Sequence, residues 1–265
     1  MQSAADTVIP LRKPEESELS AVKTLRKALT ILGAFAGSER PLTVAEVAII
    51  TGITRPTAHR LVQTLVAEGF LSQNPADGRL SPGFSVLQLA GRLLDSNRLR
   101  LEALPHLEEL ARSCGERSNL GILHRGELLF LAGVEKPSLP TIYSRFGKTA
   151  PAYCVSLGKA IFADLPRAQL DAYLADRPLL RRTPNTITRQ SALRRELTSI
   201  KRQGYAVDRE EYMTGTFCVA AAILVDRTPV GAVGLTGRSL DGLMQYVGAV
   251  RHTAEVISHV LSRGA

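Results

Sequence analysis

The stretch from Leu42 to Gly83 constrains the fold more than any other part of the chain. It holds two short segments with helical apolar periodicity, separated by Thr51 to Thr54. A hairpin-like segment with an Asp77-Gly78 turn follows directly. Helix, tight turn, helix and β-wing in this order are typical of a winged helix-turn-helix, a module that places its second helix in the DNA major groove.

Helix start and stop signals bound both segments. In the first, Thr43 is the expected N-cap with Glu46 three residues on, and Gly52 supplies the permissive backbone where the helix stops. In the second, Thr54 is the expected N-cap, and Pro56 falls in the first turn, where a missing N–H costs little. The apolar face of this second helix is formed by Ala58, Leu61, Val62, Leu65 and Val66.

The opposite face of the second helix carries residue types suited to DNA. Arginine pairs with guanine, glutamine with adenine, and threonine contacts phosphate or a thymine methyl. The positive end of the helix dipole favours phosphate as well. A solvated helix face has a similar composition, so this alternative stays open for each single residue. The residues predicted to contact DNA are Thr54, Arg55, Thr57, His59, Arg60 and Gln63, with Arg79 from the wing.

Several ordered motifs resemble one family, the IclR family of bacterial transcriptional regulators. The resemblance covers nearly everything from Ala21 onward and includes the family's helix-turn-helix, its pocket segment and its G-(Y/F)-(A/S)-x-D-x-E-E signature. Ala222 is a departure, since the family's C-(I/L/V)-A-A-P-I strand usually has Pro at that position. The matching residues are 52–61, Leu65, 68–71, 151–153, 156–160, 204–211 and 218–223.

The resemblance implies a GAF-like sensor domain with a pocket for a small effector. Independently of it, residues 156–159 begin a predicted helix, whose free N–H groups beside the hydroxyl of Ser156 suit a carboxylate. An organic acid is therefore the expected effector, and the Tyr153-Cys154 context resembles family members that sense aromatic acids. Core packing is the alternative role of the aliphatic positions. The matching family positions are Leu139, Ile142, Ala150, Ser156, Leu157, Asp208, Cys218, Gly234 and Thr236.

We predict an α+β protein in which a winged helix-turn-helix is joined by a linker helix to a GAF-like mixed α/β effector-binding domain. The apolar face of its opening helix is Val22, Leu25, Leu29 and Leu32. The predicted domains are a flexible tail over 1–20, the DNA-binding domain over 21–83, the linker helix over 84–99 and the sensor domain over 100–265.

Grouped strands flanked by helices predict an antiparallel sheet in the sensor domain, covered on one or both faces. A hairpin is expected over 118–135 with Arg125-Gly126 at its turn, and Arg227-Thr228-Pro229 is expected to turn the last two strands. Further strands are predicted over 141–146, 205–209, 217–226 and 230–236, and helices over 101–114, 156–165, 190–203 and 240–262.

Composition excludes several classes of protein. No apolar run approaches the ~18 residues of a membrane span, and the N-terminus lacks the apolar core of a signal peptide, so a cytoplasmic location is expected. The net charge of +8 is spread over both halves and supports a polyanion partner only weakly. The three cysteines, widely spaced, favour neither a disulfide framework nor a metal cluster. We expect no metal and no cofactor.

The predicted function is a ligand-responsive transcriptional regulator of a catabolic or metabolic operon. A homodimer, or a dimer of dimers, would bind a pseudo-palindromic operator in double-stranded DNA. Two alternatives stay open. One is a small-molecule-processing enzyme that uses Cys218 or Ser156 as nucleophile and keeps a vestigial DNA-binding module. The other is an architectural DNA-binding protein without a ligand. The enzyme lacks a base placed by sequence context, so no catalytic residue is predicted.

Overall fold

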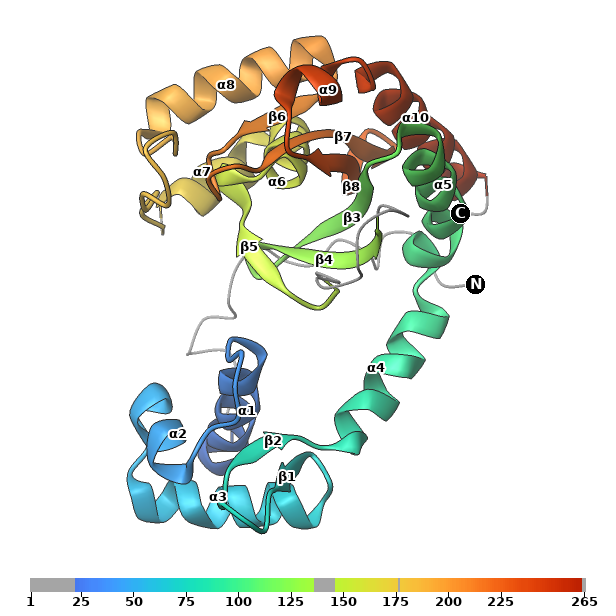
Figure 1. Ribbon diagram of the computed structural model, residues 1–265. Helices are drawn as coiled ribbons and strands as arrows, with labels where there is room; N and C mark the ends of the chain where they lie inside the picture. Colours follow the sequence, from blue (N-terminus) through green and yellow to red (C-terminus); the bar gives the residue numbers. More distant parts are fainter. Residues whose placement is uncertain (1–21, 136–145, 176, 264–265) are drawn as a thin grey trace. The chain divides into compact units, whose positions relative to one another are not determined.

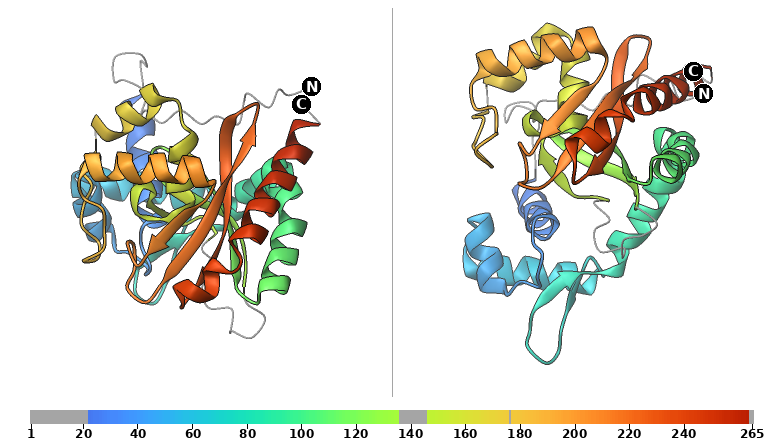
Figure 2. Two further views of the ribbon diagram at one scale, coloured as in Figure 1. Left: turned by 90° about the horizontal axis from the view of Figure 1, so that it is seen from above. Right: turned by 45° about the horizontal axis from the view of Figure 1, so that its top comes forward.

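The computed structural model describes residues 22–135, 146–175 and 177–263 (Figures 1 and 2). Leu139, Ile142, most of the strand predicted over 141–146 and the predicted tail lie outside these residues. The chain divides into two compact units between Asn97 and Arg98.

The N-terminal unit is the predicted winged helix-turn-helix with a further helix at its end. The two wing strands pair antiparallel around the turn at Gly78, and Leu42 bridges to Leu80 of the wing. In chain order its elements are α1 (Lys23–Ala36), α2 (Val44–Thr51), α3 (Arg55–Ala67), β1 (Leu71–Gln73), β2 (Leu80–Pro82) and α4 (Phe84–Ser96).

Local chemistry fixes the boundaries of α2 and α3. The hydroxyl of Thr43 accepts the N–H of Glu46, whose carboxylate accepts the N–H of Thr43, so the predicted capping box is confirmed. Gly52 ends α2 in the left-handed conformation at φ +67°, as a glycine there allows. Thr54 occupies the N-cap of α3, but the predicted side-chain cap is wrong, because its hydroxyl donates to the hydroxyl of Thr57 at 3.0 Å.

The core of this unit lies between α1, α2, α3 and the wing. Ala58, Val62 and Leu65 of α3 are buried in it, as the apolar face predicts. On α1 the buried residues are Ile31 and Phe35, whereas most of the predicted apolar face is exposed. None of the residues of α4 is buried.

The C-terminal unit is a six-stranded antiparallel sheet with helices on both faces (Figure 1). Its strand order is β5-β4-β3-β8-β7-β6. Helices α5 and α10 pack on one face, and α6 packs on the other with α7 and α8 outside it. The elements are α5 (Arg98–Cys114), β3 (Arg117–His124), β4 (Glu127–Val134), β5 (Thr149–Pro151), the 3-10 helix η2 (Ala152–Cys154), α6 (Ser156–Asp164), α7 (Arg167–Ala175), α8 (Gln190–Gln203), β6 (Ala206–Arg209), β7 (Phe217–Val225), β8 (Thr228–Gly237), α9 (Leu240–Met244) and α10 (Val247–Ser262).

The structure confirms the α+β fold and corrects three local predictions. The helix predicted over 240–262 is two helices, because the N–H of Tyr246 bonds to the carbonyl of Leu243 at 2.9 Å and ends α9. Asp226 and Arg227, both at positive φ, make the turn between β7 and β8, and Pro229 lies within β8. Helix α7 follows Pro166, a helix start signal that the sequence prediction missed.

Candidate functional sites

The exposed face of α3 is the first candidate site. Arg55, His59, Arg60 and Gln63 are exposed, and Arg60 lies opposite the buried residues of the helix, whereas Arg55 is exposed at its first residue. Thr54 is exposed and Thr57 is half-buried. Within the described residues, neither Arg55 nor Arg60 forms an ion pair, so both guanidinium groups are available to a ligand. The structure thus brings six of the predicted DNA-binding residues to one helix and its N-cap.

Arg79 differs from these residues because it is already engaged. Its guanidinium lies 3.8 Å from Asp77 and 3.7 Å from Glu46, and it donates to the carbonyl of Pro41 at 3.2 Å. Glu46 also accepts from Arg40 at 2.6 Å, and this hydrogen bond with those from Thr43 lowers the pKa of Glu46 to about 2. These contacts of Arg79 connect the wing to the start of α2. A contact between Arg79 and DNA would compete with them.

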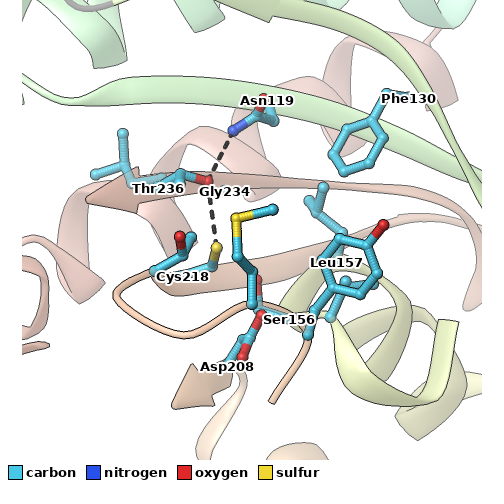
Figure 3. Close-up of a pocket in the computed structure, with 13 residues that line it drawn as sticks. Asn119, Phe130, Ser156, Leu157, Asp208, Cys218, Gly234 and Thr236 are labelled. Atoms are coloured by element: carbon cyan, nitrogen blue, oxygen red, sulfur yellow. Dashed lines mark hydrogen bonds between the residues drawn. The ribbon is translucent and has the colours of Figure 1, made fainter. Parts of the chain in front are cut away.

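A pocket in the C-terminal unit is the second candidate site, and six of the nine predicted effector residues line it (Figure 3). They are Ser156, Leu157, Asp208, Cys218, Gly234 and Thr236. Ala150 is not among the lining residues: it lies on β5, where it pairs with Leu128 of β4, and it belongs to the core that α6 helps to form. The sequence prediction missed the other lining residues, which are Asn119, Phe130, Val155, Tyr212, Met213, Thr216 and Leu235.

Strand register places the polar side of the pocket. Asp208 on β6 pairs with Cys218 on β7, which pairs with Thr236 on β8. The amide of Asn119 on β3 donates to the hydroxyl of Thr236 at 3.0 Å, and that hydroxyl lies 3.2 Å from the sulfur of Cys218 (Figure 3). A continuous row of hydrogen-bonding groups therefore crosses the sheet beneath the N-terminus of α6.

Gly234 has a steric reason to be glycine. A Cβ atom built on it would lie 2.4 Å from the carbonyl oxygen of Val219 and 2.8 Å from the Cβ of Ala220. Real Cβ atoms do not approach backbone so closely, so a hydroxyl side chain at this position requires β7 and β8 to shift. The hydroxyl that β8 contributes to the pocket is that of Thr236.

Buried charges lie behind the pocket. Lys159 of α6 is fully buried and forms an ion pair with Glu211, and its Nζ lies 3.5 Å from Oε1 of the partly exposed Glu196. Asp208 is 2% exposed, and its Oδ1 accepts the N–H of Glu211 at 2.7 Å. Burial, assisted by the charge of Glu211, raises the pKa of Asp208 to about 7.

The space between the lining side chains is narrow, with room for about one water molecule. Met213 lines the pocket but is 49% exposed, so it lies at the mouth. A benzoate-sized ligand therefore requires side chains at the mouth to move. A flexible methionine suits such a position because it adapts its shape at low cost.

The enzyme alternative needs a base beside Cys218 or Ser156. No histidine is among the described residues that line the pocket. The thiol of Cys154 lies in the core, where burial raises its pKa to about 12. Over the described ranges, no group of three His, Cys, Asp or Glu side chains could hold a metal ion. The helices in these ranges are also too short or too polar to cross a membrane.

Comparison with known proteins covers both sites. Residues 24–75 match the IclR helix-turn-helix domain, and residues 91–259 match the bacterial transcriptional regulator IclR C-terminal domain. The glycerol operon regulatory protein of Streptomyces coelicolor is 35% identical over 250 residues, which cover 92% of this chain and 98% of that protein.

Solved structures agree over the same span. A transcriptional regulator from Rhodococcus sp. RHA1 is 30% identical with a TM-score of 0.76, and the alignment covers 92% of this chain and 100% of that one. An IclR homolog from Microbacterium hydrocarbonoxydans, solved in complex with 4-hydroxybenzoate, is 25% identical with a TM-score of 0.78 over 91% of this chain and 100% of that one. The similarity therefore extends across both units.

Proposed function

Because the chain belongs to the IclR family of bacterial transcriptional regulators, we propose that α3 binds an operator and that a small organic acid in the pocket controls this binding. The observation that carries the first part is the exposed face of α3. Its side chains Arg55, Arg60 and Gln63 have the chemistry of base and phosphate recognition, and they stand on a helix held rigidly by its buried face.

A second copy of the chain is the partner that we propose for the apolar surface of the N-terminal unit. Val22 at the N-cap of α1 and Leu25 and Leu29 on α1 are each more than half exposed, and Phe84 and Leu87 on α4 are as well. A helix without a buried residue gains little stability alone, so α4 needs a partner to cover it. Pairing through these helices would present two copies of α3 to a pseudo-palindromic site, with half-sites about 34 Å apart.

The pocket supports an anionic effector with an apolar body. The first turn of α6, which begins at Ser156, supplies N–H groups and a hydroxyl, and Thr236 and Asn119 supply further hydrogen bonds. Phe130, Leu157 and the other apolar lining residues suit an aromatic or aliphatic body. The relative bound to 4-hydroxybenzoate makes this acid a reasonable first probe. Effector and operator are coupled if the acid binds more tightly to one arrangement of the dimer.

The DNA-binding proposal is tested by fluorescence anisotropy on a labelled duplex from upstream of the protein's own gene, against a scrambled duplex, at about 150 mM salt. The Arg60→Ala variant should lose about 1–3 kcal/mol of binding free energy, roughly a tenfold or greater loss of affinity. Arg202→Ala removes an exposed arginine from α8 in the other unit and should bind normally. Equal affinity of the wild type and the Arg60→Ala variant would refute the assignment of α3.

The effector proposal is tested by Ser156→Ala, which removes a buried hydroxyl at the start of α6 with little change in volume. The variant should bind the operator normally, and its response to an effector identified with the wild type should weaken. An unchanged response would place the effector elsewhere.

A further inference from the structure

In and behind the lining of the pocket, the described residues include more buried carboxyl groups than buried cations. Lys159 is the cation, and it already has Glu211 in direct contact and Glu196 at 3.5 Å. Asp208 is a further carboxyl group, almost fully buried, and unlike Glu196 and Glu211 it lines the pocket itself. A carboxylate there would be a third negative charge beside a single ammonium group.

Among the described residues, Lys159 is the cation that acts on Asp208, and Arg182 acts on the neighbouring thiol of Cys154. The charges that act most strongly on Asp208 are those of Glu211, in the loop after β6, and Lys159, on α6. From β7 the thiol-bearing Cys218 pairs with it, and the buried thiol of Cys154 in η2 lies close enough to interact electrostatically. Backbone N–H groups of the loop stabilise the carboxylate, but burial outweighs them.

We propose that Asp208 enters effector binding as a neutral carboxylic acid that donates a hydrogen bond to the carboxylate of the effector. This proposal rests on the organic-acid pocket of the proposed function. An ionised Asp208 would repel an anion in the same narrow space, whereas its acid form offers a charge-assisted hydrogen bond. Asp208 thereby selects anions over neutral ligands, although it is itself an acidic residue.

Proton linkage follows from this arrangement. An anion bound beside Asp208 raises the pKa of that carboxyl further above about 7, so the complex holds a proton that the free protein partly releases at neutral pH. Effector affinity should therefore fall by up to about tenfold per pH unit as the pH rises above the pKa of Asp208 in the free protein.

The ligand-free protein provides the first test. The pKa of Asp208 is about 7 in the folded chain and near 3.8 when unfolded, so between these values only the folded state holds the proton. The stability contributed by Asp208 is thus present at low pH and is lost as the pH rises to about 7. The sign is opposite to that of an ion-paired carboxylate.

We would measure urea unfolding of the full chain and of Asp208→Asn from pH 5.5 to 8.5. The asparagine resembles the neutral acid, so the unfolding constant of the wild type should rise by up to about tenfold per pH unit relative to the variant, and level off above pH ~7. Asp171→Asn, which changes a partly exposed carboxylate paired with Arg194, should show no such rise. A flat ratio, or a variant that becomes relatively less stable as pH rises, would overturn the proposal.

If the Asp208→Asn variant does not fold, infrared spectroscopy of the wild type tests the protonation state of Asp208 directly. Infrared spectra of the wild type with ¹³C-labelled aspartate carboxyl groups should show a protonated aspartate at pH 5.5 that disappears by pH 8.5. Absence of this band would also overturn the proposal.

Calorimetry with 4-hydroxybenzoate in two buffers of different ionisation enthalpy then tests the donor role. Binding near pH 8 should take up close to one proton, and binding without uptake would overturn the donor role. The pH profile of stability and the binding heat can also disagree. If the profile is as expected and 4-hydroxybenzoate gives no binding heat, this acid is excluded as the effector, and the neutral state of Asp208 is retained.

Discussion

Replacing Glu211 by Gln should destabilise the C-terminal unit more than any conservative change at an exposed carboxylate. The side chain of Glu211 is 5% exposed and contacts the fully buried ammonium group of Lys159. Breaking a buried pair costs about 3–5 kcal/mol, because the remaining charge stays buried without its counter-ion. In the variant, Glu196 still compensates part of the charge of Lys159, because its Oε1 lies 3.5 Å from the Nζ of Lys159. We therefore expect the lower end of the range, about 3 kcal/mol.

The matched control is Glu196→Gln, which touches the same ammonium group from a position that is 29% exposed to solvent. An ion pair open to water contributes about 0–1 kcal/mol, so this variant should remain near wild type. Thermal unfolding of the full chain at pH 7.5, followed by circular dichroism, should show a Tm about 6–12 °C lower for Glu211→Gln. Equal shifts for both variants, or no shift for Glu211→Gln, would refute the view that Glu211 is the main counter-ion of Lys159.

Three further outcomes test other parts of the structure. The pKa of Glu46 is lowered to about 2, so its contribution to stability is present above its ordinary value of 4.5 and lost as pH falls towards about 2; Glu46→Gln should remove this acid sensitivity in pH-dependent unfolding. Gly234→Ser should cost about 1–3 kcal/mol and lower the Tm, because its Cβ would collide with the backbone of β7. The double change Leu25→Glu and Leu87→Glu should leave a folded monomer in analytical ultracentrifugation, and an unchanged dimer would contradict the proposed interface.

Local signals predicted much of the fold. The capping box at Thr43 and the left-handed Gly52 depend only on neighbouring residues, and the bounds predicted for α8 match the structure to the residue. The break between α9 and α10 was not predicted, because the apolar periodicity continues through Tyr246. Periodicity also could not tell which apolar face of α1 packs inside its own chain, since a face for a partner has the same pattern.

The lining of the pocket was predicted only in part. Six of its lining residues were predicted through the resemblance to the family, on segments that carry recognisable motifs. Asn119 was missed because nothing beside it in the sequence marks it as polar lining. It reaches the pocket only because β3 pairs with β8, which brings it to Thr236, a residue 117 positions away. Its role as an effector contact, like that of the predicted residues, stays a prediction.

The order of strands in the sheet has a consequence for how copies of the chain associate. Among the described strands, the two edges are β5 and β6, with three and four residues. These short strands cover only part of their neighbours, since β6 pairs with Phe217 to Ala220 of the nine-residue β7. Among the described strands, none pairs with the outer edge of β7 beyond Ala220, where the N–H of Leu224 donates to the hydroxyl of Ser258 on α10. Unpaired backbone at a sheet edge can pair with a strand of another molecule, so this part of β7 is where sheets of two copies would first join.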